Sequence, residues 1–412
     1  MNTKKETIVG LDIGSAKIAT VIGVKKETGI DIIGVGTAPS AGLRKGIIVD
    51  LEETISAISE SLEKAERMAG TIVETAVVGI GGAHIESQNS KGVIAVSRPD
   101  GEITEEDVAR AIDAAKAVTI PANREVIHVI PRIYTVDGQE GIKEPVGMTG
   151  IRLEVEAHVI SASTPVIKNL EKAVWQAGIS ISDLVFLGLA ESELFLNKQQ
   201  REMGVVLVDI GAATTTMTVF EEGDILYSTV LPVGSNHITN DIAIGLRIAW
   251  PLAEKLKLKF GQAVSEGIRE SEKIDLAKFD KMETQKVAKS YLAEIIEARL
   301  VEIFNLVQDE LKEINREGTL PAGVVLVGGG SKIPKIVELA KETLKLPVEL
   351  GKMEVEFGGF SDKIKDPAMA GAVSLMHWGA KYGTIRAKSV PAMASAKSAF
   401  DKIKNLIERL TK

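Results

Sequence analysis

The chain contains 412 residues, and single domains rarely exceed about 250–300 residues, so we expect at least two hydrophobic cores. Its formal net charge of −8 argues against a nucleic-acid surface as the main function, because binding to phosphate backbones requires a basic face. Cysteine is absent, which excludes disulfides and thiolate metal sites, and the five histidines are too scattered in the sequence to predict a metal site.

The start of the chain shows no pattern typical of a signal peptide. Residues 1–6 are polar and contain lysine, and a strand-like run follows them instead of an apolar segment. No apolar stretch approaches the ~18 residues that are needed to span a bilayer. We therefore expect a soluble intracellular protein without a membrane-spanning helix.

A phosphate-binding hairpin is predicted near the start of the chain. Residues 8–22 read IVGLDIGSAKIATVI, in which two runs rich in valine and isoleucine flank a short turn of small residues. Gly14 lacks a Cβ, so backbone N–H groups can approach an anion closely. Ser15 adds a hydroxyl donor and Lys17 a positive charge for phosphates. Asp12 suits a water-mediated contact with Mg²⁺, an ion that keeps much of its hydration shell.

A separate packing unit is predicted between residues 84 and 162. Thr104 and Asp107 form a capping box, which is typical of the first turn of a helix. Apolar residues then recur at helical spacing as far as Ala115, and a proline follows the end of this pattern. The segment therefore contains a helix that can cover a small core of its own.

The hairpin pattern recurs near the middle of the chain. Residues 205–220 read VVLVDIGAATTTMTVF and place Asp209 and Gly211 at equivalent positions of the strand and the turn. Thr214 and Thr215 supply hydroxyl donors. A single hairpin of this kind is more often structural than functional, but two copies, one at the head of each half of the chain, predict two related lobes that share one ligand.

A glycine triplet follows the next predicted strand. Residues 324–334 read VVLVGGGSKIP, and a helical pattern comes after them. Gly328, Gly329 and Gly330 can let a flat ring lie directly on the backbone, and Ser331 is expected to cap the helix. Alone, a glycine triplet often marks only a tight turn. After two phosphate hairpins it predicts an adenosine pocket.

The end of the chain predicts a linker and an amphipathic helix. Residues 389–398 are rich in alanine, serine and lysine, as flexible linkers are. In residues 399–412 the apolar side chains share one helical face, opposite lysine and arginine. These apolar residues are Phe400, Ile403, Leu406, Ile407 and Leu410. Such a helix more often docks on its own domain, whereas its terminal position after a linker favours a membrane surface.

The two hairpins and the glycine triplet, in this order, resemble the actin, sugar-kinase and heat-shock-chaperone superfamily of two-lobed ATP-binding proteins. Longer ungapped runs are similar to the bacterial cell-division family FtsA, and such runs are more specific than short motifs. They include GLDIGSAKIATVIG from residue 10, PVGSNHITNDIAIGL from residue 232 and LAEIIEARLVE from residue 292. The resemblance covers essentially the whole chain. It implies an α/β actin-like fold with duplicated ribonuclease-H-like lobes, an ATP cleft and an inserted α+β subdomain.

The resemblance also implies a division into domains. The expected segments are 1–83, 163–196 and 361–388 for the first lobe core, 84–162 for the inserted subdomain, 197–235 and 316–360 for the second lobe core, 236–315 for its outer subdomain, 389–398 for the linker and 399–412 for a membrane-targeting helix. In the family, the inserted subdomain replaces the outer subdomain of the first lobe of actin. It is expected to contribute to contacts between subunits in filaments and to contacts with other division proteins.

The family's ATP site transfers to this chain residue by residue. The implied phosphate contacts are Gly14, Ser15, Lys17, Gly211, Ala212, Ala213, Thr214 and Thr215, with Gly234 and Asn236 nearby. The implied ribose and base contacts are Glu254, Lys257, Gly329, Gly330, Ser331 and Ile333. Asp12 and Asp209 would hold Mg²⁺ through water. Without the resemblance, Glu254 and Lys257, one turn apart on a helix, would be interpreted as a solvated surface pair.

We expect weak or negligible ATP hydrolysis, so that ATP acts as a structural ligand. The second hairpin has Ala212 and Ala213 where strong hydrolases of the superfamily carry glycines, and Thr216 where they carry an acid. The connecting strand ends in FLGL, which offers no carboxylate or amide to activate water. Glu191 and Glu193 are nearby acids that could contradict this expectation. No catalytic residue is assigned.

The resemblance implies a peptide partner and a membrane. In the family, the outer subdomain of the second lobe binds the C-terminal peptide of the tubulin-like protein FtsZ, and the protein forms actin-like filaments on the cytoplasmic face of the membrane at the division site. The matching residues, on a helix from about 287 to 315, are Lys289, Arg299, Glu302 and Asn305. Spacing alone equally permits Arg299 to pair within the helix with Glu302 or Glu294.

Two other classes of protein remain open at this point. A cytoplasmic adaptor of pilus assembly of the PilM kind shares the insertion, although the basic terminal helix and the IIEARLVE stretch favour FtsA. A small-molecule kinase of the same superfamily would be expected to carry an acid as base in the cleft of the first lobe and to lack a lipid-binding tail.

Overall fold

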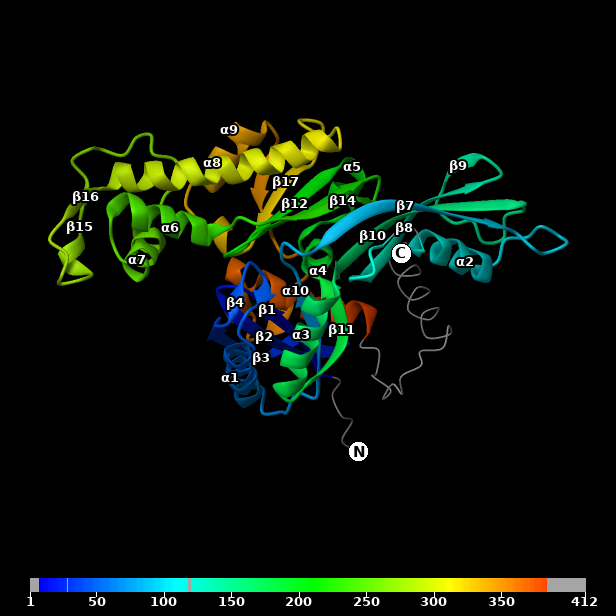
Figure 1. Ribbon diagram of the computed structural model, residues 1–412, viewed down its shortest axis with the longest axis horizontal. Helices are drawn as coiled ribbons and strands as arrows, with labels where there is room; N and C mark the ends of the chain where they lie inside the picture. Colours follow the sequence, from blue (N-terminus) through cyan, green and yellow to red (C-terminus); the bar gives the residue numbers. More distant parts are fainter. Residues whose placement is uncertain (1–6, 28, 118–119, 384–412) are drawn as a thin grey trace.

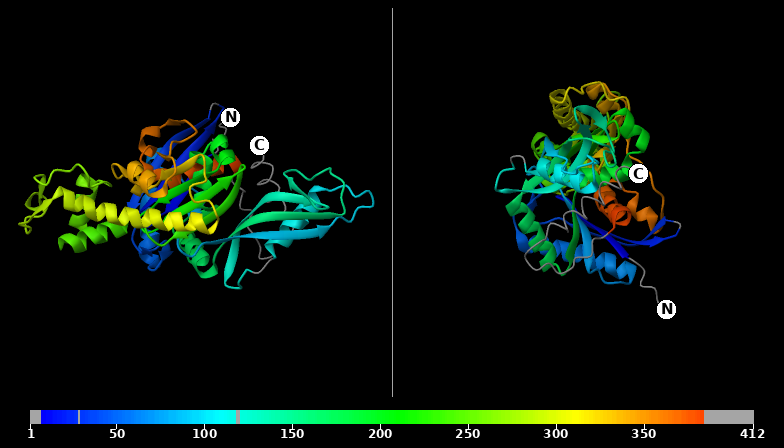
Figure 2. Two further views of the ribbon diagram at one scale, coloured as in Figure 1. Left: turned by 90° about the horizontal axis from the view of Figure 1, so that it is seen from above. Right: turned by 90° about the vertical axis from the view of Figure 1, so that its right-hand side faces the viewer.

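The computed structural model describes residues 7–27, 29–117 and 120–383 (Figure 1). Two lobes lie one above the other in Figure 1, with the first lobe in blue below and the second in green to orange above. A sheet with one helix extends from them at one end, and a helical region that contains α7 lies at the opposite end (Figure 2). In this part of the chain no helix is both long enough and apolar enough to cross a bilayer.

The first lobe is built on a six-stranded sheet with the order β11-β6-β1-β2-β3-β19. Its strands are β1 (Thr7–Ile13), β2 (Lys17–Lys26), β3 (Gly29–Pro39), β6 (Thr75–Ile80), β11 (Ser180–Phe186) and β19 (Phe357–Gly359). β1, β2 and β3 are consecutive antiparallel strands, whereas β6 runs parallel to β1, and β11 runs parallel to β6. The first predicted hairpin, β1 with β2, is therefore confirmed, and it occupies the middle of the sheet.

The second lobe repeats this topology. Its sheet has the order β14-β13-β12-β17-β18, with β12 (Val205–Ile210), β13 (Thr215–Glu221), β14 (Asp224–Leu231), β17 (Gly323–Val327) and β18 (Val348–Leu350). Again three consecutive strands are antiparallel, and two parallel strands follow on the side of the first. The second hairpin is confirmed, and the two lobes are structural duplicates.

Helices cover both faces of the first sheet. α1 (Leu51–Ala69) and α3 (Thr164–Gln176) lie on one face, while α4 (Leu187–Phe195) and α10 (Ala370–Tyr382) lie between the two lobes. α1 begins where the Asp50 side chain accepts a hydrogen bond from the Glu53 N–H, and it ends at Gly70, which has φ of 66°. Gly36 lets α1 pack closely, because a Cβ there would lie 1.9 Å from the Ser61 carbonyl oxygen.

The sheet of the second lobe shares one face with the first lobe. Along β12, Val205 and Leu207 belong to the same apolar cluster as α4 and α10, whereas Val206 and Val208 face the helices of the second lobe. This alternation follows from the period of two in a strand. Those helices are α6 (Ser235–Leu246), α7 (Trp250–Phe260), α8 (Lys289–Glu313) and α9 (Ile336–Leu344). α4 and α10 therefore form the apolar layer between the lobes.

The insertion folds as a four-stranded sheet with the order β7-β10-β8-β9, and α2 packs on it. Its elements are β7 (Glu86–Ala95), α2 (Glu105–Lys116), β8 (Arg124–Val136), β9 (Gln139–Ile142) and β10 (Arg152–Ser163). The predicted capping box is confirmed, since the Thr104 N–H donates to Asp107 Oδ2 at 2.9 Å and the Asp107 N–H donates to Thr104 Oγ1 at 3.3 Å. The insertion also has its own apolar core, as predicted.

Two buried histidines attach the insertion to the two lobes. On the first lobe, the Phe186 N–H donates to His128 Nε2 at 3.0 Å. On the side of the second lobe, His158 Nε2 lies 2.9 Å from Ser228 Oγ, while its Nδ1 lies 2.7 Å from Asn89 Oδ1 of β7 within the insertion. Burial lowers the pKa of His128 to about 4, and that of His158 to about 3, so both rings are neutral near pH 7. The insertion is therefore attached to both sides of the molecule.

Shorter elements complete the chain. They are β4 (Leu43–Arg44), β5 (Ile47–Ile48), α5 (Lys198–Met203), β15 (Lys273–Asp275), β16 (Lys286–Ala288) and the 3₁₀ turns Leu276–Lys278, Gly329–Lys332, Ser361–Ile364 and Pro367–Met369. The capping role expected for Ser331 is wrong. α9 begins only at Ile336, after Lys335 with φ of 63°, and the Ser331 hydroxyl instead donates to the Gly328 carbonyl oxygen at 2.8 Å within the turn.

Candidate functional site

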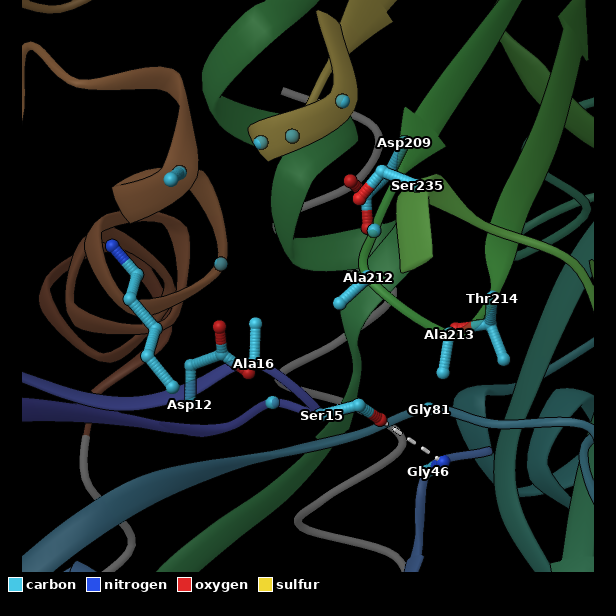
Figure 3. Close-up of a pocket in the computed structure, with 18 of the residues that line it drawn as sticks. Asp12, Ser15, Ala16, Gly46, Gly81, Asp209, Ala212, Ala213, Thr214 and Ser235 are labelled. Atoms are coloured by element: carbon cyan, nitrogen blue, oxygen red, sulfur yellow. Dashed lines mark hydrogen bonds between the residues drawn. The ribbon is translucent and has the colours of Figure 1, made fainter. Parts of the chain in front are cut away.

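A cavity of about 600 Å³ lies between the two lobes. The turns of both hairpins form its walls: the turn after Asp12 comes from the first lobe, and the turn after Asp209 comes from the second and faces it (Figure 3). The Gly329–Lys332 turn and the first residues of α6 and α10 close other sides. The cavity thus joins segments that are far apart in the sequence, and it lies where the duplicated topology brings equivalent loops together.

The two hairpin turns have almost the same local geometry. A Cβ on Gly14 would lie 2.9 Å from the Lys17 carbonyl oxygen, and a Cβ on Gly211 would lie 2.9 Å from the Thr214 carbonyl oxygen. Glycine is therefore required by the tightness of each turn. The turn of the first hairpin is also tied to β5 and β4, because the N–H of Gly46 between them donates to Ser15 Oγ at 3.2 Å (Figure 3).

Both aspartates are covered by a glycine from another element. Gly328, which has φ of 82°, lies so close to Asp209 that a Cβ would be 1.8 Å from its Oδ1. At the start of α10, a Cβ on Gly371 would be 2.7 Å from Asp12 Oδ2. The glycine triplet therefore has a function that the sequence did not reveal: its first member makes room for the Asp209 carboxylate.

Three carboxyl groups line the centre of the cavity. Burial raises the pKa of Asp12 to about 6, although Lys17 lowers it, and burial together with the charge of Asp12 raises the pKa of Asp209 to about 7. The third group is Glu191 of α4, whose pKa is raised first by burial and then by the charges of Asp209 and Asp12. Carboxyl groups that are shifted by burial and by each other are typical of functional sites.

Lys17 lies at the edge of this acidic centre. Its Nζ lies 3.2 Å from Met369 Sδ, and burial lowers its pKa although Asp366 and Asp12 raise it. Across the cavity, Lys332 of the second lobe forms an ion pair with Asp366 of the first at 2.9 Å. These cations lie at the rim where a polyanionic ligand would extend from one lobe to the other.

The other end of the cavity is lined by α6 and α7. Lys257 is buried and donates hydrogen bonds to the Ser235 carbonyl oxygen at 3.1 Å and to Thr239 Oγ1 at 2.7 Å, and it pairs with Glu254 at 2.8 Å. Burial lowers the pKa of Lys257, although Glu254 opposes this shift. The interpretation of Glu254 and Lys257 as a solvated surface pair is therefore wrong, because both line the cavity.

The cavity brings together most of the residues that the sequence singled out. Its lining includes Asp12, Gly14, Ser15, Lys17, Asp209, Gly211, Ala212, Ala213, Thr214, Asn236, Glu254, Lys257, Gly329, Gly330 and Ile333. Three others lie behind the lining. Thr215 is buried and donates to the Val233 carbonyl oxygen at 2.9 Å, Gly234 packs against the turn at Ala212, and Ser331 holds the glycine turn. These three support the wall from behind.

Sequence reasoning missed several lining residues. Gly79, Gly81 and His84 come from the end of β6 and the segment after it, the counterpart of β17 and its glycine triplet. A visible signal existed, because VVGIGGAH after the first hairpin parallels VVLVGGGSK after the second. Both ring nitrogens of His84 are buried without a hydrogen-bond partner in the part of the chain described, and burial with the charge of Arg124 lowers the pKa of the ring to about 4. Gly371 and Ala368, near the start of α10, gave no local signal.

The two acids that could contradict the expectation of slow hydrolysis differ in position. Glu191 is in the cavity wall. Glu193 faces away from it, where it forms ion pairs with Arg201 of α5 at 2.7 Å and with Lys381 at the end of α10. Leu187 and Thr216, where the superfamily usually has polar or acidic side chains, also line the cavity. Glu191 is therefore the acid of this pair that lines the cavity.

The predicted peptide contacts are placed on α8. Arg299 donates to both oxygens of Asp241 on α6, at 2.6 and 3.0 Å, and to Glu302 at 2.7 Å. The intrahelical pair with Glu302 is therefore present, while the partner Asp241 was not foreseen. Lys289 lies ten residues before Arg299, about 15 Å away along the helix. Asn305 is exposed. α8 itself spans Lys289–Glu313, slightly shorter than expected.

The residues Phe400, Ile403, Leu406, Ile407 and Leu410, which were predicted to bind a membrane, lie outside the described residues.

The duplicated lobes, the interlobe cavity and the paired hairpins define an actin-like protein. Solved structures confirm this fold: a PilM-PilN type IV pilus biogenesis complex matches with a TM-score of 0.66 and 16% identity over 90% of this chain and 98% of the other. The structure of MreB5 of Spiroplasma citri bound to ADP matches with a TM-score of 0.54 and 12% identity over 97% and 99%. At these identities the likeness shows the fold alone.

Sequence comparison shows the family. A model described as the SHS2 domain inserted in FtsA matches residues 82–161, and one described as cell division protein FtsA matches residues 206–374. Cell division protein FtsA of Pseudomonas aeruginosa is 38% identical over 90% of this chain and 89% of its own length, and that of Bacillus subtilis is 36% identical over 93% and 86%. FtsA of Escherichia coli K12 is 34% identical over 92% and 91%.

The chain belongs to the FtsA family of actin-like cell-division proteins. The resemblance stated from the sequence is confirmed, and it decides between the three classes that the sequence left open. The likeness to PilM remains one of fold.

Proposed function

We propose that the interlobe cavity binds ATP together with Mg²⁺. The observation that carries this proposal is the pair of equivalent hairpin turns, which face each other across one cavity with an aspartate at the end of each preceding strand. The fold neighbour MreB5 was solved with ADP and with AMPPNP, so this architecture accommodates adenine nucleotides in another protein. The phosphates would lie between the turns, and the base would lie near Glu254, Lys257 and the Gly329–Lys332 turn.

The carboxyl groups suit a hydrated divalent cation. Among the residues described, no group of three or more His, Cys, Asp or Glu side chains is close enough to hold a metal ion. Mg²⁺ keeps several waters and takes few protein ligands when phosphates are present. Asp12 and Asp209 would therefore hold the ion through its waters. When bound, the ion neutralises phosphate charge.

A charge placed in the second turn tests the site directly. Ala213→Glu puts a carboxylate where the phosphates are proposed to lie, while Ala213→Gln has nearly the same shape without the charge. Isothermal titration with Mg-ATP is expected to give one site per chain in the wild-type protein, weaker binding in the glutamine variant and a further loss in the glutamate variant. Equal affinity in both variants would place the phosphates elsewhere.

Hydrolysis in this site is proposed to be weak. The neutral side chains of Leu187 and Thr216 support this, because phosphoryl transfer to water needs a group that positions or activates the water. A dedicated phosphotransferase turns over at roughly 1–100 s⁻¹. Steady-state phosphate release well below that range is expected, and a rate within it would contradict the proposal.

We also propose that the protein forms filaments on the cytoplasmic membrane face at the division site and tethers FtsZ there. Its relatives are named cell-division proteins, and the amphipathic pattern of residues 399–412 supports a lipid contact. One helix binds lipid weakly, but many copies in a filament gain avidity of roughly 10²–10⁴. Deleting residues 400–412 should abolish co-sedimentation with vesicles and leave ATP binding intact. Electron microscopy with and without ATP would show whether filaments coat the vesicles.

The FtsZ tail is proposed to bind along α8, and the Arg299–Asp241 contact changes how this is tested. Arg299→Glu alone disrupts the link between α8 and α6, so a loss of peptide binding would have two explanations. The charge swap Arg299→Glu with Asp241→Arg restores an ion pair in the reverse sense. If Arg299 contacts the peptide, the swap stays defective in a fluorescence-anisotropy assay. Rescue by the swap would assign Arg299 a structural role.

A further inference from the structure

Glu191 has an unusual position in the wall of the cavity. It belongs to α4, the helix between the lobes, and only 2% of its surface is exposed. Its Oε2 is buried without a hydrogen-bond partner among the residues that the structure describes. A buried carboxyl group that lacks a partner is costly, and Glu191 belongs to the lining of the cavity, so this group is expected to meet a ligand that occupies the cavity.

The neighbouring charges show which kind of ligand fits. The carboxylates that act on Glu191 are Asp209 from the second lobe and Asp12 from the first. The cations that line the cavity have other partners: Lys257 pairs with Glu254, and Lys332 pairs with Asp366. Lys17, the remaining lysine of the lining, contacts Met369 and is one cation that acts on a single acid of the centre, Asp12. The centre of the cavity is therefore acidic, with contributions from both lobes and from the helix between them.

Glu193 on the same helix provides an internal comparison. It is also buried, but it is neutralised by Arg201 and Lys381. The chain therefore compensates one buried acid of α4 with two cations and leaves Glu191 uncompensated, facing the cavity.

We propose that Glu191 makes nucleotide binding dependent on a divalent cation, by adding a third carboxylate to the centre where the phosphates and their hydrated cation bind. This rests on the proposed ATP site. These three acids oppose the phosphates of a metal-free nucleotide, because bringing more negative charge into a poorly solvated, acidic cleft is costly. A hydrated Mg²⁺ on the phosphates reverses the sign of that interaction, and its waters can donate hydrogen bonds to the Glu191 carboxylate. The contact is through water, since no group of three or more such side chains among the described residues could hold a metal ion by itself.

The test compares ATP affinity with and without the cation. The full chain is titrated with ATP in Mg²⁺ and with ATP in EDTA, for wild type, Glu191→Gln and Glu171→Gln. For each protein, the dissociation constant in EDTA is divided by the dissociation constant in Mg²⁺. Glu171 is the matched control, because α3 contributes Val166 and Leu170 to the lining while Glu171 points away from it. Mn²⁺ in place of Mg²⁺ should give the same pattern.

Wild type and Glu171→Gln should bind ATP much more tightly in Mg²⁺ than in EDTA. Glu191→Gln should bind more tightly than wild type in EDTA and more weakly in Mg²⁺, so that the ratio falls by about tenfold or more, equivalent to about 1.4 kcal/mol. An unchanged ratio, or loss of binding in EDTA by a folded Glu191→Gln, would overturn the role of Glu191. Wild type that binds in neither condition would instead refute the ATP site itself.

Folding is measured separately. Thermal unfolding without nucleotide should show Glu191→Gln at least as stable as wild type, because the amide replaces an acid whose ionised form burial and the neighbouring acids disfavour. If the glutamine variant does not fold, Glu191→Ala removes the charge without adding amide donors, and the same ratio applies to it.

Discussion

At the scale of single residues, the cavity contains carboxyl groups whose pKa values are raised, so that they lose their protons at a higher pH than ordinary aspartates. Burial raises the pKa of Asp12 to about 6, and burial together with the charge of Asp12 raises the pKa of Asp209 to about 7. In the unfolded chain both titrate near 3.8. Between these values the folded, nucleotide-free protein binds more protons than the unfolded chain, so these two groups make folding less favourable as pH rises.

This direction of the pH dependence gives a prediction for the stability of Asp209→Asn. Without divalent cations, the free energy of unfolding of the variant relative to wild type should increase between about pH 4 and pH 7 by the order of 1–3 kcal/mol, because only wild type must bury a second charge. The buried histidines act in the opposite direction over part of this range, but they are present in both proteins and cancel in the difference. Denaturant unfolding at pH 5 and pH 8 measures this. A difference that does not change with pH would contradict the shifted pKa.

The glycine triplet offers a second test at this scale. Gly328→Ala forces a side chain against Asp209 at a left-handed φ and should lower the free energy of unfolding by more than about 2 kcal/mol. Gly329→Ala is the matched change, because its Cβ would approach nothing nearer than Ala368 at 3.5 Å. Its stability should stay within about 0.5 kcal/mol of wild type. Chemical denaturation of both variants decides this, and equal stabilities would remove the steric explanation.

At the scale of elements, three helices meet at one buried ion cluster. Glu193 of α4 joins Arg201 of α5 and Lys381 in the last turn of α10. Burial raises the pKa of Glu193, but Arg201 and Lys381 outweigh burial and leave the pKa below its ordinary value. Glu193→Gln leaves two cations without their acid and should lower the free energy of unfolding by about 3 kcal/mol.

The exposed Glu202 of α5 is the control for that change. Glu202→Gln removes the same charge from the neighbouring surface and should alter stability by less than about 0.5 kcal/mol. If Glu193→Gln and Glu202→Gln changed the free energy of unfolding by similar amounts, the ion cluster would contribute little to the stability of the interface between these helices.

The two histidines of the insertion give a matched pair of predictions. His158→Ala should speed hydrogen exchange in β14, because it removes the side chain that joins Ser228 and Asn89. His128→Ala should instead affect the end of β11, where it accepts from the Phe186 N–H. Exchange measured by mass spectrometry should separate the two sites while α2 stays protected. Faster exchange throughout the insertion in both variants would show general unfolding instead.

Local sequence patterns were enough for the elements whose signal is contained in one segment. Both hairpins and the capping box at Thr104 were predictable, because strand alternation and turn chemistry act between near neighbours. Contacts between distant segments were not: Arg299 binds Asp241 58 positions away, and Gly371 reaches Asp12 from the far end of the chain. The cap at Ser331 failed because Lys335 adopts a left-handed conformation and delays the helix.

At the scale of the whole molecule, the duplication explains why one cavity exists. Each sheet ends its first strand in an aspartate and a tight turn, and the layer of α4 and α10 sets the two turns face to face. The insertion, attached by His128 to one lobe and by His158 to the other, bridges both. A ligand that draws the turns together should therefore also affect the sheet of the insertion, whose strands contribute no residue to the cavity lining.

The central claim is that both hairpin turns hold the same nucleotide, and hydrogen exchange of the wild-type protein with and without Mg-ATP tests it most directly. One equivalent of nucleotide should slow exchange together in residues 13–17, 210–215 and 328–332, with the same dependence on ATP concentration at all three. Protection of only one turn, or protection with two different concentration dependences, would contradict the account.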